Sequence, residues 1–239
     1  MSINSEIIEN KVKEFNKNIE IWKNNNFEYL FSKRDLKDPR DTVLLTLLSK
    51  TLKDFEAYVL LIDRRLGEPA AKLLRSMYHS YLWMRWILID DNVSHYMKSS
   101  EYASLKMVRG ISGRGLVDFG SLENSEEVKT KLNQEAEKIS FPSPERMANE
   151  TNCNDLHALI YPGLSAMDHG NMMFMGERLN DKQISISPDE LNIIPFFFPA
   201  SLLFEESTLL CKVWIEDKKI KNVELPNPKL HIFGKKFSK

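Results

Sequence analysis

Apolar residues recur at helical spacing along most of this chain, and this pattern constrains the fold more than any other feature. The first stripe comprises Ile8, Val12, Phe15, Ile19 and Trp22. Intervals of three and four residues place such a stripe on one face of a helix, here over about residues 4–24. The run Asn24–Asn26 then predicts the end of that helix.

The same period predicts further helices, separated by Gly, Pro and polar stretches. They cover about residues 41–65, 68–90, 93–108, 125–138, 155–170 and 199–217, with a short capped turn after Ser143. Asp41 is expected to cap the second helix, and Pro69 suits the first turn of the third. Alternation over residues 183–187 indicates a short strand or an extended loop.

These elements predict an all-α fold of one domain, a bundle of five to seven helices with at most one short strand or hairpin. The domain is expected to span residues 1–217, followed by a basic tail over residues 218–239. Phe196–Phe198 is expected to lie in the core or in a dimer interface, because no basic residue interleaves it.

Composition excludes several classes of protein. With 33 basic and 34 acidic residues the net charge is -1, so any nucleic-acid site must be local. Two distant cysteines, Cys153 and Cys211, exclude a disulfide framework and fit a reducing, cytoplasmic location. The N-terminus has no signal-peptide pattern, and the most apolar stretch, residues 193–204, is shorter than the roughly 20 residues that span a bilayer. The few glycines form no dinucleotide or P-loop fingerprint.

Arg75 and His79 form the first candidate site. They are four residues apart on the most apolar predicted helix and therefore share a face. A charge in such a helix is costly unless it is paired. Arg75 is therefore either a structural residue bonded to a carboxylate or to backbone carbonyls, or part of a cleft for an anionic ligand.

Tyr161, Ser165 and His169 form the second candidate site, because their spacing gives one polar stripe on a helix, with Asn171 just beyond it. His169 lies at the predicted helix end, where the helix dipole favours the imidazolium. It acts there either as a cap or as a general acid. No histidine spacing typical of zinc sites occurs, so no metal is expected.

Residues 109–123 are predicted to be a Gly-rich loop carrying Arg109 and Arg114. Such a loop is either a mobile surface segment or a nest of backbone N–H groups that binds a phosphate.

A resemblance joins the two candidate sites. Leu73–Ser76 and the set Tyr161, Ser165 and His169 resemble an uncharacterised family of bacterial helical proteins, over about residues 44–217. In that family a Leu-Leu-Arg-Ser-x-x-Glu helix precedes a Tyr-x3-Ser-x3-His helix. This chain departs from the pattern at His79, which stands in place of Glu.

The arrangement is also similar to HEPN-type domains, the higher-eukaryote and prokaryote nucleotide-binding domains. Many of these are dimeric, metal-independent ribonucleases of toxin and antiphage systems, with an Arg and a His separated by four to six residues. Only three residues separate Arg75 from His79, so the strict motif is absent. Catalysis would require Arg75 and His169 to converge from two helices.

The resemblance implies an endoribonuclease without a cofactor, acting on RNA as a homo-oligomer. Its implied catalytic residues are Arg75, His79 and His169, and its implied substrate-binding residues are Tyr161, Ser165, Asn171, Arg109 and Arg114. Two alternatives stay open: a non-catalytic module that binds a nucleotide or another anion, and a purely structural oligomer.

Overall fold

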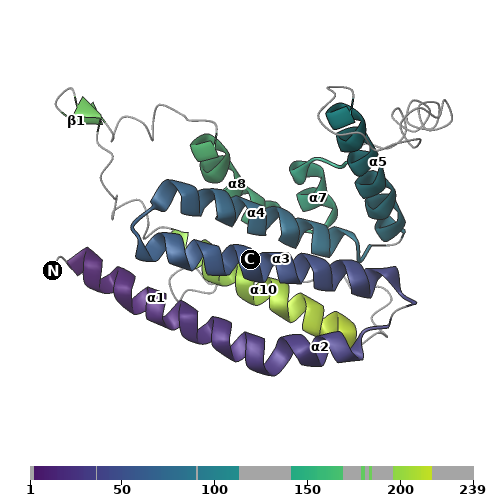
Figure 1. Ribbon diagram of the computed structural model, residues 1–239, viewed down its shortest axis with the longest axis horizontal. Helices are drawn as coiled ribbons and strands as arrows, with labels where there is room; N and C mark the ends of the chain where they lie inside the picture. Colours follow the sequence, from purple (N-terminus) through teal and green to yellow (C-terminus); the bar gives the residue numbers. More distant parts are fainter. Residues whose placement is uncertain are drawn as a thin grey trace. The chain divides into compact units, whose positions relative to one another are not determined.

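The computed structural model describes residues 3–35, 37–89, 91–112, 141–168, 179–180, 183–184 and 196–216. Its helices are α1 (Ile3–Trp22), α2 (Glu28–Lys33), α3 (Pro39–Asp63), α4 (Gly67–Trp86), α5 (Asn92–Ser112), α7 (Pro144–Glu150), α8 (Asn154–Asp168) and α10 (Phe197–Glu216), with a π-helical turn η1 (Lys23–Phe27) (Figure 1). Two-residue strands, β1 (Leu179–Asn180) and β2 (Gln183–Ile184), pair antiparallel. The predicted all-α class with at most one short hairpin is confirmed.

The chain divides into two compact units. The first comprises residues 1–85 and 144–239, and the second residues 86–143. The first unit therefore holds α1–α3, nearly all of α4, and α7, α8 and α10, while α5 belongs to the second. The predicted domain boundary at residue 217 falls beyond the last described residue and stays a prediction.

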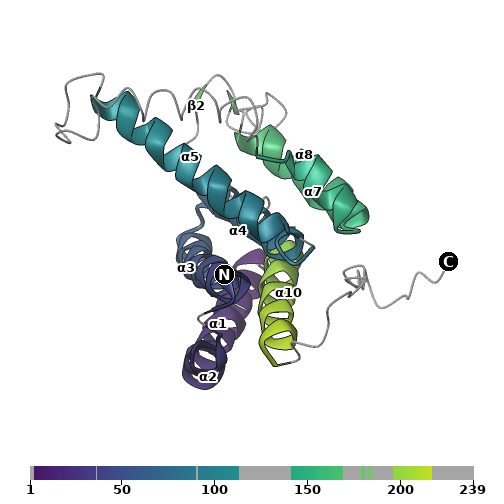
Figure 2. The same cartoon turned by 90° about the vertical axis from the view of Figure 1, so that its right-hand side faces the viewer.

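The core of the first unit forms where α1, α3 and α10 meet. Figure 1 shows these helices running beside one another, and they stay adjacent in Figure 2, where α1 and α3 are seen nearly end-on. Phe55 of α3 lies between aromatic rings of the other two helices, with its ring centroid 5.1 Å from Phe15 and 4.5 Å from Phe204. The predicted apolar stripe of α1 faces this core, because Ile8, Val12, Phe15 and Ile19 are all buried.

The start of α3 corrects one prediction. Asp38, not Asp41, caps the helix: its carboxylate accepts from the Arg40 backbone N–H at 2.9 Å. The reason is Pro39, whose fixed backbone angle suits the first helical position and starts the helix before residue 41. Asp41 is instead fully buried within the first turn.

One predicted helix end is confirmed and another is wrong. α1 ends at Trp22, close to the predicted end, and Asn24–Asn26 lie in the π-helical turn that leads into α2, where Leu30 is completely buried. Gly110 does not stop α5, which continues to Ser112, because glycine within a helix costs only about 1 kcal/mol and no proline follows it.

The predicted helix over 125–138 lies outside the described residues, as does the basic tail. Among the described helices, none is both long and apolar enough to cross a membrane.

Candidate functional site

Three of the residues predicted from sequence meet between α4 and α8. The guanidinium of Arg75 lies 5.7 Å from the centroid of the Tyr161 ring, a distance typical of a cation–π contact. The His79 ring stacks on the same tyrosine at 6.1 Å between centroids and 22° between planes. Arg75, His79 and Tyr161 therefore form one group, although they come from separate segments of the chain.

Two further residues complete this group, and neither was singled out from the sequence. His157 stacks on Tyr161 at 4.6 Å and 17°, and its Nδ1 forms a 2.7 Å hydrogen bond with the Tyr78 hydroxyl. Spacing in the sequence could have identified His157, because it precedes Tyr161 by four residues and therefore lies on the same face of the helix. We call Arg75, Tyr78, His79, His157 and Tyr161 the imidazole cluster.

Burial and neighbouring charge keep both imidazoles of the cluster neutral at pH 7. Burial lowers the pKa of His79 below its ordinary value of 6.5, and the positive charges of Arg75 and Lys50 lower it further. Burial also lowers the pKa of His157, opposed by the nearby carboxylate of Glu145. A neutral imidazole can accept a proton, so both rings are candidates for acid–base chemistry.

The Nε2 atom of His79 is buried, and no described residue forms a hydrogen bond with it. Leaving a buried polar atom unsatisfied costs about 1–3 kcal/mol. Native structures rarely retain such atoms without a reason, and a catalytic role is one recognised reason. This nitrogen is therefore available to a ligand.

Lys50 of α3 adds a second cation beside the cluster. Its ammonium donates to the Ser76 hydroxyl on α4 and to the Asp54 carboxylate at 2.6 Å. Ser76 directly follows Arg75 in the chain, so Lys50 brings α3 to the edge of the imidazole cluster.

Arg85 is a structural arginine of α4. It is only 2% exposed and donates to the Tyr81 hydroxyl at 3.0 Å and to the Thr151 carbonyl at 2.8 Å. Arg75, on the same helix, is half-buried. Its assignment to a ligand-binding cleft stays a prediction.

The other predicted site residues are placed as follows. Ser165 is half-buried on α8, one turn beyond Tyr161, and Arg109 belongs to α5 in the second unit. His169, Asn171 and Arg114 lie outside the described residues, so the convergence of Arg75 with His169 stays a prediction. Within the described ranges, no three His, Cys, Asp or Glu side chains gather as a metal site.

The model of a family of unknown function, DUF5677, matches residues 41–185. The chain belongs to this family. The DUF5677 segment contains α3, α4, α5, α7 and α8, and therefore the whole imidazole cluster together with Lys50. Comparison with curated proteins and comparison with solved structures gave no match.

Proposed function

We propose that the imidazole cluster is the active site of a HEPN-like, metal-independent endoribonuclease. One observation carries the proposal: two neutral imidazoles share the Tyr161 ring, one oriented by the Tyr78 hydroxyl and the other with a buried Nε2 that forms no hydrogen bond with any described residue. A general base held in place by a third group is the usual arrangement in acid–base catalysis.

The proposed reaction is transesterification within the RNA strand. His79 takes the proton of the ribose 2′-hydroxyl, and the resulting oxygen attacks the adjacent phosphorus. Burial makes the protonated form of His157 a minority at pH 7, and it is this minority form that donates its proton to the leaving 5′-oxygen. The products are a 2′,3′-cyclic phosphate and a 5′-hydroxyl end. Arg75 stabilises the negative charge that builds up on the phosphoryl oxygens.

The test is cleavage of a fluorogenic single-stranded RNA in EDTA. We expect His157→Ala and His79→Ala to lower the rate by about 10²- to 10⁴-fold, as for other general acid–base residues, and Arg75→Ala by about 10²- to 10³-fold. The same assay on His169→Ala tests the predicted catalytic role of His169.

Two matched variants serve as controls. His95 of α5 is also half-buried against an aromatic ring, that of Trp86 at 5.5 Å, and Arg146 of α7 is an exposed, ion-paired arginine. His95→Ala and Arg146→Ala should leave the rate unchanged. Absence of cleavage by the wild-type chain, or equal rates for cluster and control variants, contradicts the proposal.

The stacked rings also favour a second function, a non-catalytic module that binds a nucleotide. Tyr161 lies against His157 and His79 with ring planes 17° and 22° apart, an arrangement suited to extension by a nucleobase. A thermal-shift screen distinguishes the two functions, because a ligand of the folded state alone raises Tm. A rise in Tm with nucleotides, without any cleavage of RNA, favours the binding module.

The finer parts of the proposal are a cytoplasmic location, a homo-oligomeric state and a role as a toxin or in antiphage defence. They follow from the resemblance to HEPN-type domains and from the cysteine content. Size-exclusion chromatography with light scattering tests the oligomer, and growth on expression of the wild type against His157→Ala tests toxicity.

A further inference from the structure

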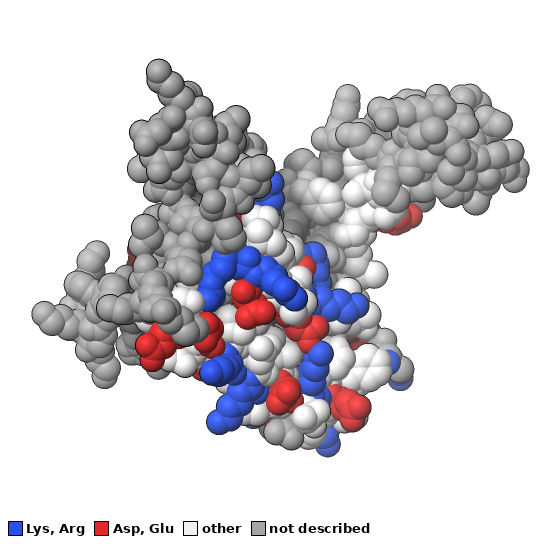
Figure 3. Space-filling view, turned by 60° about the vertical axis from the view of Figure 1, so that its left-hand side comes forward, with Lys and Arg blue, Asp and Glu red and all other residues white. Residues whose placement is uncertain are grey.

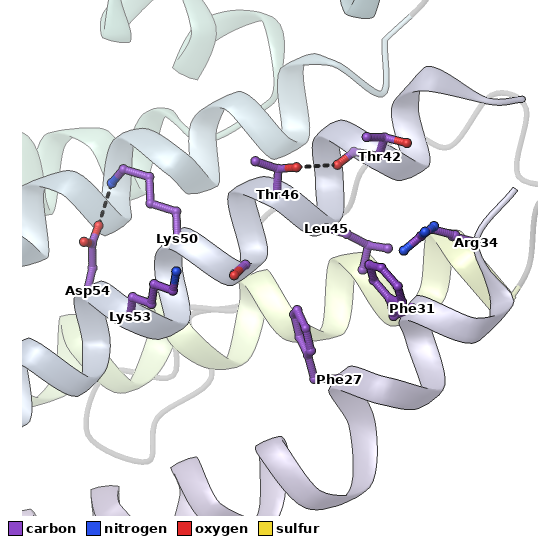
Figure 4. A pocket seen from close by; sticks show the side chains of 10 residues that line it. Phe27, Phe31, Arg34, Thr42, Leu45, Thr46, Lys50, Lys53 and Asp54 are labelled. Carbon is purple, nitrogen blue, oxygen red and sulfur yellow. Dashed lines mark hydrogen bonds and ion pairs between the residues drawn. The ribbon is translucent and has the colours of Figure 1, made fainter. Parts of the chain in front are cut away.

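A groove of about 630 Å³ runs between α3 and the η1–α2 segment. Figure 4 shows Phe27, Phe31 and Arg34 on one wall and α3 on the other. The α3 wall extends from Thr42 to Asp54, which corresponds to about 18 Å along the helix axis. The groove is thus long enough for an extended ligand.

The first wall presents an aromatic surface to solvent. The Phe31 side chain is 50% exposed, and the guanidinium of Arg34 lies over its ring at 3.3 Å. Phe27, one helical turn before Phe31, lines the same groove. An exposed ring with a cation on its face is the arrangement on which nucleobases stack in proteins that bind single-stranded nucleic acid.

The groove also offers uncompensated positive charge. In the described part of the chain, no carboxylate forms an ion pair with Arg34 or with Lys53, whereas Lys50 is paired with Asp54. Elsewhere the charges are mixed, since the face of the molecule in Figure 3 carries both basic and acidic side chains. Local cations beside aromatic rings suit a phosphate-linked ligand in a protein of net charge -1.

Lys50 connects the groove to the imidazole cluster. Its side chain lines one end of the groove and also donates to Ser76, the residue after Arg75. The same ammonium is one of the charges that face His79. Lys50 is therefore common to the groove and to the surroundings of His79.

We propose that this groove binds the single-stranded RNA segment adjoining the phosphodiester that is cleaved at the imidazole cluster. Bases stack on Phe31 and Phe27, and phosphates bind Arg34 and Lys53. This inference rests on the proposed function for the cluster, and it adds the substrate class: unpaired RNA that is longer than the scissile dinucleotide. The DUF5677 match begins at residue 41, so it includes the α3 wall and leaves out the aromatic wall.

The experiment measures binding separately from cleavage. The probe is a fluorescent 2′-O-methyl RNA decamer, which lacks the attacking hydroxyl, titrated with the full chain and followed by anisotropy. Removing a stacked aromatic ring costs about tenfold in affinity, and we expect this loss for Phe31→Ala. Tyr29→Ala is the matched control, since Tyr29 is 44% exposed on the same helix with Lys33 over its ring at 5.8 Å, yet does not line the groove.

Lys53→Ala should weaken decamer binding and reduce its salt dependence, whereas Lys33→Ala should do neither. A dinucleotide probe should bind more weakly than the decamer and respond less to Phe31→Ala, because it does not reach along the groove. Adenosine monophosphate distinguishes a free nucleotide from a strand. Binding of the mononucleotide that depends on Phe31, without binding of the decamer, overturns the inference.

The outcomes separate this inference from the proposed function. Equal decamer affinity for Phe31→Ala and Tyr29→Ala, with RNA cleavage intact, overturns the groove and leaves the nuclease standing. Selective loss in Phe31→Ala, without cleavage by the wild type, supports the groove as an RNA site and overturns the nuclease. Absence of decamer binding by the wild-type chain overturns the groove whatever the cleavage assay gives.

Discussion

The hydrogen bond between Tyr78 and His157 is the contact that orients an imidazole within the cluster. Tyr78→Phe removes the 2.7 Å hydrogen bond and keeps the ring that packs against Tyr161. We expect a loss of about 1 kcal/mol in the free energy of unfolding, and a fall in RNA cleavage of up to about a hundredfold as the imidazole loses its orientation. Denaturant titration and single-turnover kinetics measure these two effects.

Tyr29→Phe is the control for that variant, because Tyr29 is exposed and lies outside the cluster. It should change neither quantity. Unaltered cleavage by Tyr78→Phe, in a protein that unfolds at the same denaturant concentration as the wild type, would show that the hydroxyl does not orient His157.

Protonation of His79 gives a pH dependence with a definite sign. Its pKa is lowered in the folded chain by burial and by the charges of Arg75 and Lys50, with a smaller effect of His157. As pH falls below the unfolded value of about 6.5, the unfolded chain takes up a proton before the folded chain does. The free energy of unfolding must therefore fall as pH drops from 6.5 toward the folded pKa, and it is fully retained above 6.5.

Replacing His79 by Gln removes this titration. Denaturant unfolding at a series of pH values should show that the free energy of unfolding falls less at acid pH for His79→Gln than for the wild type. If the free energy of unfolding falls equally at acid pH for His79→Gln and the wild type, the lowered pKa of His79 is contradicted. The pH dependence that remains in His79→Gln should come partly from His157, whose pKa is also lowered.

At this scale three of the five residues of the cluster could be predicted from the sequence. Spacing within one helix showed that Arg75 and His79 share a face, and that Tyr161 heads a polar stripe. It could not show that His157 and Tyr78 meet, because 79 residues separate them and only the packing of α8 against α4 brings them together. Contacts of this kind depend on tertiary structure, which single-helix periodicity does not contain.

At the scale of elements, two acidic residues at the start of α3 have different roles. Asp38 caps the helix through one partly buried hydrogen bond, whereas the buried Asp41 carboxylate accepts from the Asp35 backbone N–H at 2.6 Å and from Trp214 Nε1 at 3.0 Å. Asp41 thus joins α3 to α10 and to the segment that precedes α3. We expect Asp41→Ala to cost about 2–3 kcal/mol in the free energy of unfolding, since it removes two hydrogen bonds to a charged acceptor, and Asp38→Ala about 1 kcal/mol.

Urea denaturation of both variants measures the difference, and Asp63→Ala at the exposed end of α3 supplies a surface comparison. Equal losses for Asp41→Ala and Asp38→Ala would show that Asp41 acts as an ordinary helix cap. Sequence pattern gave the helices because apolar spacing is local. It misplaced this cap because the choice between two nearby acids depends on Pro39 and on Trp214, which lies 173 residues from Asp41.

At the scale of the whole molecule, the core extends beyond the part of the chain that defines the family. The family match covers residues 41–185. Phe55, which lies inside the match, packs on Phe15 and Phe204, which lie outside it. Helices α1 and α10 therefore cover the apolar face of α3. Without them, the Leu and Phe residues on that face would be exposed to water.

We therefore predict that the fragment of residues 41–185 does not fold by itself. Without α1 and α10 it loses the partners of Phe55, and truncating a single buried Phe already costs about 3–5 kcal/mol, a large part of the 5–15 kcal/mol that stabilises a typical domain. Far-UV circular dichroism on heating should show a cooperative transition for the full chain and none for the fragment. A chain of residues 1–217, which keeps every described helix, should melt with the full chain. A cooperative transition in the fragment would mean that the family segment is an independent domain, to which α1 and α10 are additions.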